Sequence, residues 1–204
     1  MLYLIRHGET EWNRLGRIQG TTDIPLSSRG EAQARRLANW MRNLRIHRAI
    51  ASDLTRARRT AELVFGESVP VSVDLRLRER SFGPFEGCTV AEIVGELRNR
   101  FGEVPEPFDP VDAWPYPVEV ESLEGLLERA LAVILEILEE AHHTHIALVT
   151  HGNVVHVLLA HLLQIQAKRA IRLPNCCCIE LEPRKGRLML RSMISPEMLD
   201  ASLI

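Results

Sequence analysis

The chain lacks the features that mark membrane, secreted and nucleic-acid-binding proteins. No apolar run approaches the roughly 20 residues that a helix needs to cross a bilayer, and no basic and apolar leader precedes the first strand-like segment. Lys and Arg total 25 against 27 Asp and Glu, and the net charge of −2 argues against nucleic acid or a membrane surface as a partner. We therefore expect a cytoplasmic protein.

Cysteine is scarce, and its spacing does not fit a metal site or a redox motif. The four cysteines form no C-x-x-C pair, and three of them are contiguous, Cys176, Cys177 and Cys178. Neighbouring residues of a regular strand face opposite ways, so three contiguous thiols cannot all reach one metal ion. We expect small buried apolar side chains in a strand here, and no metal.

A dinucleotide-binding fingerprint is also missing. No G-x-G-x-x-G follows the first strand-like segment, which disfavours a Rossmann nucleotide-binding protein. What is present is an ordinary globular composition, with 46% hydrophobic and 25% charged residues in 204. This length favours a single domain over residues 1–204 with a large core.

Hydrophobic patterning predicts alternating strands and helices. Strands are predicted at 2–5, 48–51, 69–73, 146–150, 176–182 and 187–193. Helices are predicted at 55–65 and 154–163 and after three capping serines or threonines, Ser28 (paired with Glu31), Thr89 (paired with Glu92) and Ser122. The alternation predicts a three-layer α/β/α sandwich with a mostly parallel sheet, which the closing hairpin makes mixed.

The segment 102–120 breaks this pattern. Five prolines within it forbid a regular helix, and it holds three aromatic residues, Phe108, Trp114 and Tyr116. Long irregular segments in compact domains are often lids or binding loops. A lid over a site and an ordinary packed surface loop are both open.

Chemistry-bearing residues follow three of the predicted strands. Arg6 and His7 end the first, His151 follows the apolar strand at 146–150, and Arg56 lies in the first turn of the helix after the strand at 48–51. Parallel strands bring their carboxyl ends to one edge, where open α/β folds bind ligands. Arginine beside imidazole is the pairing that phosphoryl transfer through a phosphohistidine requires.

With these residues in place, the chain resembles the histidine phosphatase superfamily, in its phosphoglycerate mutase-like branch 1. The first block is LIRHGETEWN at 4–13, continued by QG at 19–20 and DIPLS at 23–27. Later blocks are SDL at 52–54 with RA at 56–57, LRE at 77–79, FG at 82–83, EG at 86–87 and THGN at 150–153. The blocks run in family order from residue 2 to about residue 175.

The resemblance implies a site and a mechanism that need no metal and no cofactor. It assigns His7 as the nucleophile that carries the phosphoryl group. It also implies a phosphate pocket and adjoining substrate contacts, made by Arg6, Arg56, His151, Asn13, Gln19, Gly20 and the backbone N–H of Asn153. Glu79 resembles the acid–base residue, because a neighbouring phosphate would favour its protonated form.

Glu79 has an alternative interpretation as a salt-bridge partner, because Arg76, Arg78 and Arg80 surround it in the sequence. Glu9 is a weaker candidate for the acid. The remaining histidines match none of the blocks, and we expect them to be surface or packing residues: His47, His142, His143, His145, His156 and His161.

The resemblance favours an acid-type phosphomonoesterase that hydrolyses small phosphate esters, with a phosphoglycerate mutase as the alternative. Family mutases carry a longer insertion between the acid–base and second histidine blocks, and FGPFEG at 82–87 is similar to the phosphatase pattern. Val120 stands where family members often have the glycine of Gly-Glu-Ser. An idle scaffold member is disfavoured because the pocket set is complete. A homodimer is compatible with the sequence.

Overall fold

The structure is a computed structural model that describes residues 1–104, 117, 119–140, 144–164, 173–184 and 187–201. One sheet has the strand order β3-β2-β4-β1-β5-β6. The strands are β1 (Leu2–Arg6), β2 (Arg48–Ala51), β3 (Val71–Val73), β4 (Ile146–Thr150), β5 (Cys178–Arg184) and β6 (Arg187–Ile194). The pairs β1–β4, β2–β4 and β2–β3 are parallel, whereas β5 runs antiparallel to both β1 and β6. The predicted mixed sheet is confirmed.

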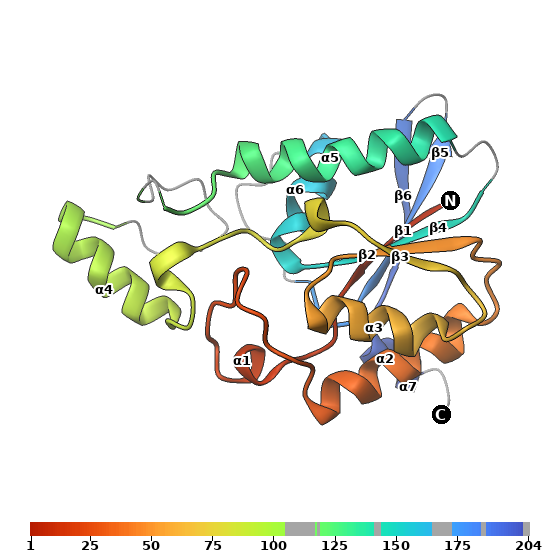
Figure 1. The fold of residues 1–204 in the computed structure, drawn as a ribbon, viewed down its shortest axis with the longest axis horizontal. Coiled ribbons are helices and arrows are strands. Elements are labelled where there is room, and N and C mark those ends of the chain that lie inside the picture. The colour runs from red at the N-terminus through yellow and green to blue at the C-terminus, as the bar shows by residue number, and fades with distance from the viewer. Residues whose placement is uncertain (105–116, 118, 141–143, 165–172, 185–186, 202–204) are drawn as a thin grey trace.

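Helices cover both faces of this sheet (Figure 1). α5 (Leu123–Glu140) and α6 (Gly152–Leu162) lie on one face, and α2 (Ser28–Met41), α3 (Thr55–Phe65) and α7 (Pro196–Ala201) lie on the other. α4 (Val90–Phe101) projects beyond the sheet (Figure 1), and α1 (Glu11–Arg14) lies between β1 and α2 in the chain. The three-layer α/β/α architecture predicted from the sequence is confirmed.

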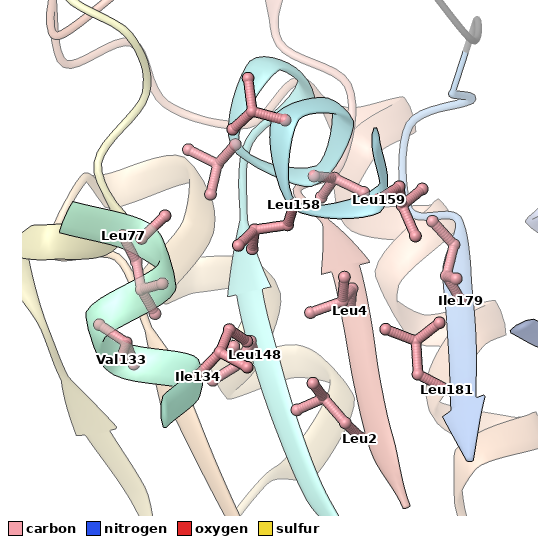
Figure 2. Close-up of a cluster of buried hydrophobic side chains, with 14 of the residues drawn as sticks. Leu2, Leu4, Leu77, Val133, Ile134, Leu148, Leu158, Leu159, Ile179 and Leu181 are labelled. Carbon is pink, nitrogen blue, oxygen red and sulfur yellow. The ribbon is translucent and has the colours of Figure 1, made fainter. Parts of the chain in front are cut away.

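The central strands are buried on both faces because their side chains alternate between two cores. Leu2 and Leu4 of β1 pack with Leu148 of β4 beneath α5 and α6 (Figure 2), while Tyr3 and Ile5 pack toward α2 and α3. Burying one such side chain contributes about 1.5–3 kcal/mol relative to leaving it exposed. The two cores fix the register of β1, and therefore where its last residues emerge.

Two predicted strands start later than expected. β3 begins at Val71, because Pro70 has no N–H to donate to the ladder. β5 begins at Cys178, because Cys176 adopts a left-handed backbone with φ of 56° and its N–H turns to the carbonyl of His7. All three contiguous thiols are buried as predicted, and burial raises the pKa of the Cys177 thiol to about 11.

The capping predictions were right in two of three cases. Thr89 and Glu92 form the expected box at α4, and the Ser122 hydroxyl accepts from the Gly125 N–H near the start of α5. At α2 the cap is Ser27 instead of Ser28, since the Ser27 hydroxyl accepts from Gly30, three residues on. Helices α1 and α7 were not predicted from the sequence pattern.

Two short 3₁₀ turns, η1 (Leu75–Leu77) and η2 (Gly83–Phe85), flank an extended segment that leads to α4. Phe82 and Phe85 form a small third core with α4 and with Val120. Most of the predicted lid at 102–120, including its three aromatic residues, lies outside the described residues. Within the described part of the chain, no helix combines the length and hydropathy needed to cross a membrane.

Candidate active site

The two histidines from separate sequence blocks meet at the carboxyl edge of the sheet. Arg6 of β1 pairs with Thr150 of β4 in the parallel register, so the next residue of each strand emerges at the same level. The ring centroids of His7 and His151 are 5.1 Å apart, and the His7 N–H donates to the Thr150 carbonyl at 2.9 Å. Parallel pairing of central strands is therefore what brings these residues together.

The hydrogen bonds of His7 fix its tautomer. Its Nδ1 lies 2.7 Å from the carbonyl oxygen of Gly8, and because a carbonyl can only accept, Nδ1 carries the proton. The lone pair is therefore on Nε2. Burial, then the positive charges of Arg56 and Arg6, holds the pKa of His7 well below its usual value. A neutral imidazole with an unprotonated Nε2 is the form that can attack phosphorus.

Arg56 is fully buried at the base of the site. Its guanidinium donates to the carbonyls of Gly20 at 2.6 Å and Thr22 at 2.8 Å, and through Nε to Nδ1 of His151 at 3.2 Å. Helix α3 has no cap of its own, and Asp23 supplies one by accepting from the Thr55 N–H at 2.8 Å. The loop after Gln19 thus holds both the helix and its arginine.

His151 presents a donor that remains unused. Because Arg56 can only donate, Nδ1 of His151 accepts, which places the proton of the neutral ring on Nε2. That Nε2 and the Nε of Arg6 are both buried with no hydrogen-bond partner among the described residues. Burial, with a further contribution from Arg56, also lowers the pKa of His151. Buried unsatisfied donors are costly, and an anion would satisfy them.

The first turn of α6 adjoins Arg6 and Glu79. A Cβ placed on Gly152 would lie 3.5 Å from the Arg6 Nε and 3.9 Å from Oε2 of Glu79. The Asn153 N–H donates to that same Oε2 at 3.3 Å, so in this structure it binds the carboxylate that was expected to lie beside the phosphate. The amide ends of a helix favour anions, and here the Glu79 carboxyl group occupies that position.

Glu79 is buried, and its contacts bear on the alternative interpretation that it is a salt-bridge partner of the neighbouring arginines. Its Oε1 accepts from the Arg80 N–H at 2.9 Å. The guanidinium of Arg76 pairs with Asp74 and Glu136, and that of Arg78 pairs with Asp53. Two of the three neighbouring arginines thus bind other carboxylates, and the carboxylate of Glu79 is held by backbone N–H groups.

Asn13 is oriented by its neighbours. Its Oδ1 accepts from the Thr10 N–H at 3.1 Å and from Nδ2 of Asn175 at 3.1 Å, so its own amide NH₂ is left as the group that can donate elsewhere. Asn175 also donates to the carbonyl of His7 at 3.2 Å. Gln19 is buried and accepts from the Thr10 hydroxyl at 2.9 Å.

Gly20 sits where no side chain fits. Its φ is +53°, and a Cβ there would lie 2.1 Å from Oε1 of Glu86. Glu86 accepts from the backbone N–H groups of Thr21, Thr22 and Phe82, and so fastens the loop whose carbonyls bind Arg56. The glycine is therefore required by both its backbone conformation and the close approach of this carboxylate.

The structure brings the residues implied for the site into one region, with the exception of Glu9, the weaker candidate for the acid, whose carboxylate accepts from the Ser27 hydroxyl and pairs with Arg29. It also adds supports that the sequence did not assign. Glu86 belongs to the EG block at 86–87, but the sequence assigned it no function in the site. Asp23 and Asn175 act through loop contacts that have no periodic pattern. Among the residues described, no group of three or more His, Cys, Asp and Glu side chains is arranged to hold a metal ion.

The remaining histidines lie elsewhere or are not described. His47 and His145 contact each other edge to face at 5.8 Å, beside the amino ends of β2 and β4. His156 is buried in α6 and His161 is exposed, while His142 and His143 lie outside the described residues.

Comparison with known proteins places this geometry in a family. A curated relative named "Probable phosphoglycerate mutase GpmB", from Escherichia fergusonii, is 34% identical over 187 residues, covering 86% of this chain and 81% of its own. A crystal structure of a phosphoserine phosphatase mutant from Entamoeba histolytica, in complex with phosphoserine, has a TM-score of 0.81 at 27% identity, covering 96% and 97% of the two chains.

A second solved structure is a mycobacterial glucosyl-3-phosphoglycerate phosphatase in complex with VO₃, with a TM-score of 0.78 at 27% identity over 93% of this chain and 96% of the other. The family model of the histidine phosphatase superfamily (branch 1) matches residues 2–195. The chain thus belongs to the histidine phosphatase superfamily, branch 1, whose members named here are phosphatases and mutases of phosphorylated metabolites.

Proposed function

We propose that this protein hydrolyses small phosphate monoesters through a phosphohistidine formed on Nε2 of His7. The observation that carries the proposal is the state of the two buried rings. His7 is held neutral with its lone pair on Nε2, and its ring centroid lies 5.1 Å from that of His151, whose Nε2–H has no partner in the described part of the chain. A nucleophile and an unsatisfied donor thus lie on neighbouring rings, with the guanidinium groups of Arg6 and Arg56 close to them.

In the first step, Nε2 of His7 forms a bond to phosphorus as the ester P–O bond breaks. The Arg6 and Arg56 guanidinium groups, the Nε2–H of His151 and the amide of Asn13 bind the equatorial oxygens. Glu79, in the protonated form that the neighbouring phosphate favours, donates its proton to the departing alcohol oxygen, so a neutral alcohol leaves.

In the second step, water attacks the phosphohistidine. Glu79, now a carboxylate, takes the proton from that water as the O–P bond forms and the P–N bond breaks. The products are inorganic phosphate and the starting form of His7. Gln19 and Gly20 would contact the substrate or its phosphate from the following loop, and no metal is assigned a role.

A phosphoglycerate mutase is the second candidate, and one observation favours it. The curated relatives at 34% to 37% identity carry the mutase name, although the solved structures reported above carry phosphatase names. A mutase returns the phosphoryl group to a second hydroxyl before water reaches it, and therefore needs a closed site.

Phosphate release from a panel of monoesters tests the proposal. The panel holds p-nitrophenyl phosphate, phosphoserine, 3-phosphoglycerate, glucosyl-3-phosphoglycerate and α-ribazole phosphate, assayed with chelator and beside His7→Ala. Release that depends on His7 is the expected result. Exchange between 3- and 2-phosphoglycerate, without net phosphate release, would establish the mutase instead.

A further inference from the structure

Glu79 lies on a stretch of chain with no regular secondary structure. It falls between the 3₁₀ turns η1 and η2, and its neighbours pair with no strand of the sheet. A segment of this kind leaves backbone carbonyls that need partners, because buried polar groups without hydrogen bonds are costly. The position of the Glu79 carboxylate therefore depends on what binds those carbonyls.

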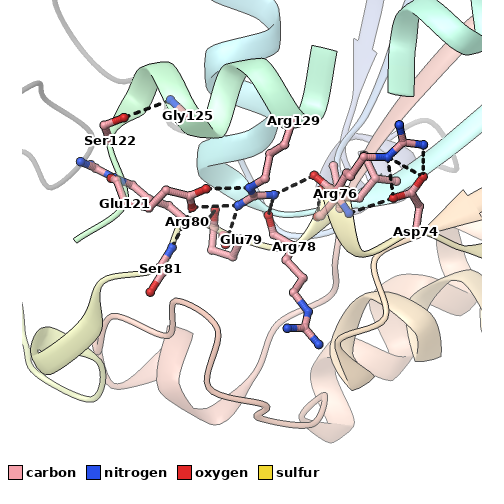
Figure 3. A network of polar contacts seen from close by, with 12 residues as sticks. Asp74, Arg76, Arg78, Glu79, Arg80, Ser81, Glu121, Ser122, Gly125 and Arg129 are labelled. Atoms are coloured by element: carbon pink, nitrogen blue, oxygen red, sulfur yellow. Dashed lines mark hydrogen bonds and ion pairs between the residues drawn. The ribbon is translucent and has the colours of Figure 1, made fainter. Parts of the chain in front are cut away.

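One side chain binds three of them. Arg129 of α5 donates from Nη1 to the carbonyls of Arg76 and Arg78, each at 2.7 Å, and from Nη2 to the carbonyl of Glu79 at 3.0 Å. Figure 3 shows this guanidinium directly over the segment that carries Glu79. Three carbonyls, one from η1 and two from the irregular stretch after it, thus converge on one planar cation.

The other donors of Arg129 go to a single carboxylate. Its Nε and Nη2 donate to the two oxygens of Glu121 at 2.7 and 2.9 Å, in a bidentate pair (Figure 3). The five N–H groups of the guanidinium therefore have five acceptors. Burial acts to raise the pKa of Glu121, but the bonds and charge of Arg129 outweigh it and hold that pKa below its usual value.

Glu121 in turn forms hydrogen bonds with the two residues after Glu79. Its Oε2 accepts from the Ser81 N–H at 3.1 Å, its own N–H donates to the Ser81 carbonyl at 2.9 Å, and its carbonyl accepts from Arg80 at 2.7 Å. Arg129 thus holds the chain from Arg76 to Glu79, and Glu121 holds the two residues that follow, Arg80 and Ser81.

We propose that Arg129, braced by Glu121, is a positioning residue that holds Glu79 in place to protonate the leaving group. This inference rests on the proposed function and adds to it the group that orients the acid. Arg129 touches no reacting atom, and it acts only through the backbone of Glu79. Lysine cannot replace it, because an ammonium has three donors and no planar fork.

Two substrates whose leaving groups differ in their need for a proton can distinguish the positioning of Glu79 from general structural support. An alkoxide from phosphoserine needs a proton as the P–O bond breaks, whereas p-nitrophenolate is stable enough to leave without one. Loss of a positioned general acid costs about 10²–10⁴-fold where the proton is needed. A displaced Glu79 should therefore slow phosphoserine and spare the p-nitrophenyl ester in the first step.

The experiment is single-turnover release of the alcohol from both esters, with wild type, Arg129→Lys, Glu121→Gln and Glu79→Gln. The matched control is Glu136→Gln, which removes an ion pair of Arg76 with the same helix α5 and leaves the contacts of Glu79 in place. We expect Arg129→Lys to slow phosphoserine by about 10²-fold and the p-nitrophenyl ester far less. Glu136→Gln should change neither.

A double variant makes the test sharper. If Arg129 acts through Glu79, then Arg129→Lys has no further effect on phosphoserine once Glu79→Gln is present. Equal slowing of both esters by Arg129→Lys, or additive effects in the double variant, would overturn the inference while leaving the hydrolase intact.

Two further comparisons keep the outcomes distinct. Glu121→Gln weakens the bidentate pair that orients Arg129 and the contact with the Ser81 N–H, so it provides the same ester comparison if Arg129→Lys does not fold. We expect it to slow phosphoserine more than the p-nitrophenyl ester, and equal slowing of both esters would likewise overturn the inference. Failure of the wild type to release phosphate from any of the five esters of the panel would refute the proposed function itself.

Discussion

Glu86 links the fold to the phosphate pocket, and its replacement by glutamine has a calculable effect. Its Oε1 accepts from the N–H groups of Thr21 at 2.9 Å and Phe82 at 3.1 Å, and its Oε2 accepts from the N–H and hydroxyl of Thr22 at 2.9 and 2.5 Å. In Glu86→Gln an NH₂ group replaces one oxygen and faces two donors. The loop that binds Arg56 then loses part of its attachment.

The magnitude follows from the donors that lose an acceptor. One backbone N–H left unsatisfied costs about 1–3 kcal/mol, and the loss at the second donor is partly offset by removal of a half-buried charge. We expect a net loss of about 2 kcal/mol in the free energy of unfolding, which is about 4–8 °C in Tm for a chain of this size. The kcat/KM should fall as well, because the Gly20 and Thr22 carbonyls orient Arg56.

The pH dependence has a definite sign. Burial acts to raise the pKa of Glu86, but the hydrogen bonds from Thr22, Thr21 and Phe82 outweigh it and hold the pKa below its usual value. A lowered carboxyl pKa contributes stability above the unfolded value of about 4.3, and that stability is lost as pH falls through the folded pKa. The difference in the free energy of unfolding between wild type and Glu86→Gln should therefore be largest at neutral pH and become smaller in acid.

Urea unfolding of both proteins at neutral pH and in acid measures this difference in the free energy of unfolding. The matched control is Glu96→Gln, an exposed residue of α4 whose ion pair with Arg100 contributes about 0.5 kcal/mol or less. If Glu86→Gln is as stable as Glu96→Gln at neutral pH, the reasoning about the loop is refuted.

Three further predictions follow from the site. His151→Gln should lower kcat/KM by about 10²–10³-fold, as loss of an oxyanion donor does, and single-turnover phosphate release that matches wild type would contradict it. Asn175→Ala should slow the same step by about tenfold, or about 1.4 kcal/mol. Asn175→Asp should be equally slow because its carboxylate cannot donate to Asn13, and wild-type activity of Asn175→Asp would count against the role of Asn175 in orienting Asn13. Because burial depresses the pKa of both His7 and His151, their contribution to stability is complete above the unfolded pKa of about 6.5 and is lost as pH falls through the folded values. The free energy of unfolding should then drop by up to about 1.4 kcal/mol per histidine for each pH unit below about 6.5, and urea midpoints that stay level there would be the contrary result.

Periodic patterning predicted the fold because burial is periodic. The apolar strand predicted at 146–150 favoured a central position in the sheet, and the structure places β4 between β1 and β2. The strand ends then followed, and with them the meeting of His7 and His151. Patterning could not show that β5 starts late, since the left-handed turn at Cys176 depends on a tertiary contact with the His7 carbonyl.

The supports of the site were harder to predict than its reactive groups. Arg129 lies on a helix where a solvated arginine is the ordinary expectation, and its five acceptors come from segments as far as 53 residues away. Asp23 caps a helix that begins 32 residues later. Such contacts are set by how loops fold over one another, and one sequence carries no periodic signal for them.

Direct detection of the phosphorylated enzyme tests the central claim. The protein would be mixed with p-nitrophenyl phosphate, quenched in base to preserve phosphohistidine, and mapped by peptide mass spectrometry against His7→Ala. We predict a transient phosphoryl group on His7 that disappears as phosphate is released, and none in the variant. Phosphate release by His7→Ala at the wild-type rate, or a phosphoryl group on another residue, would contradict the account.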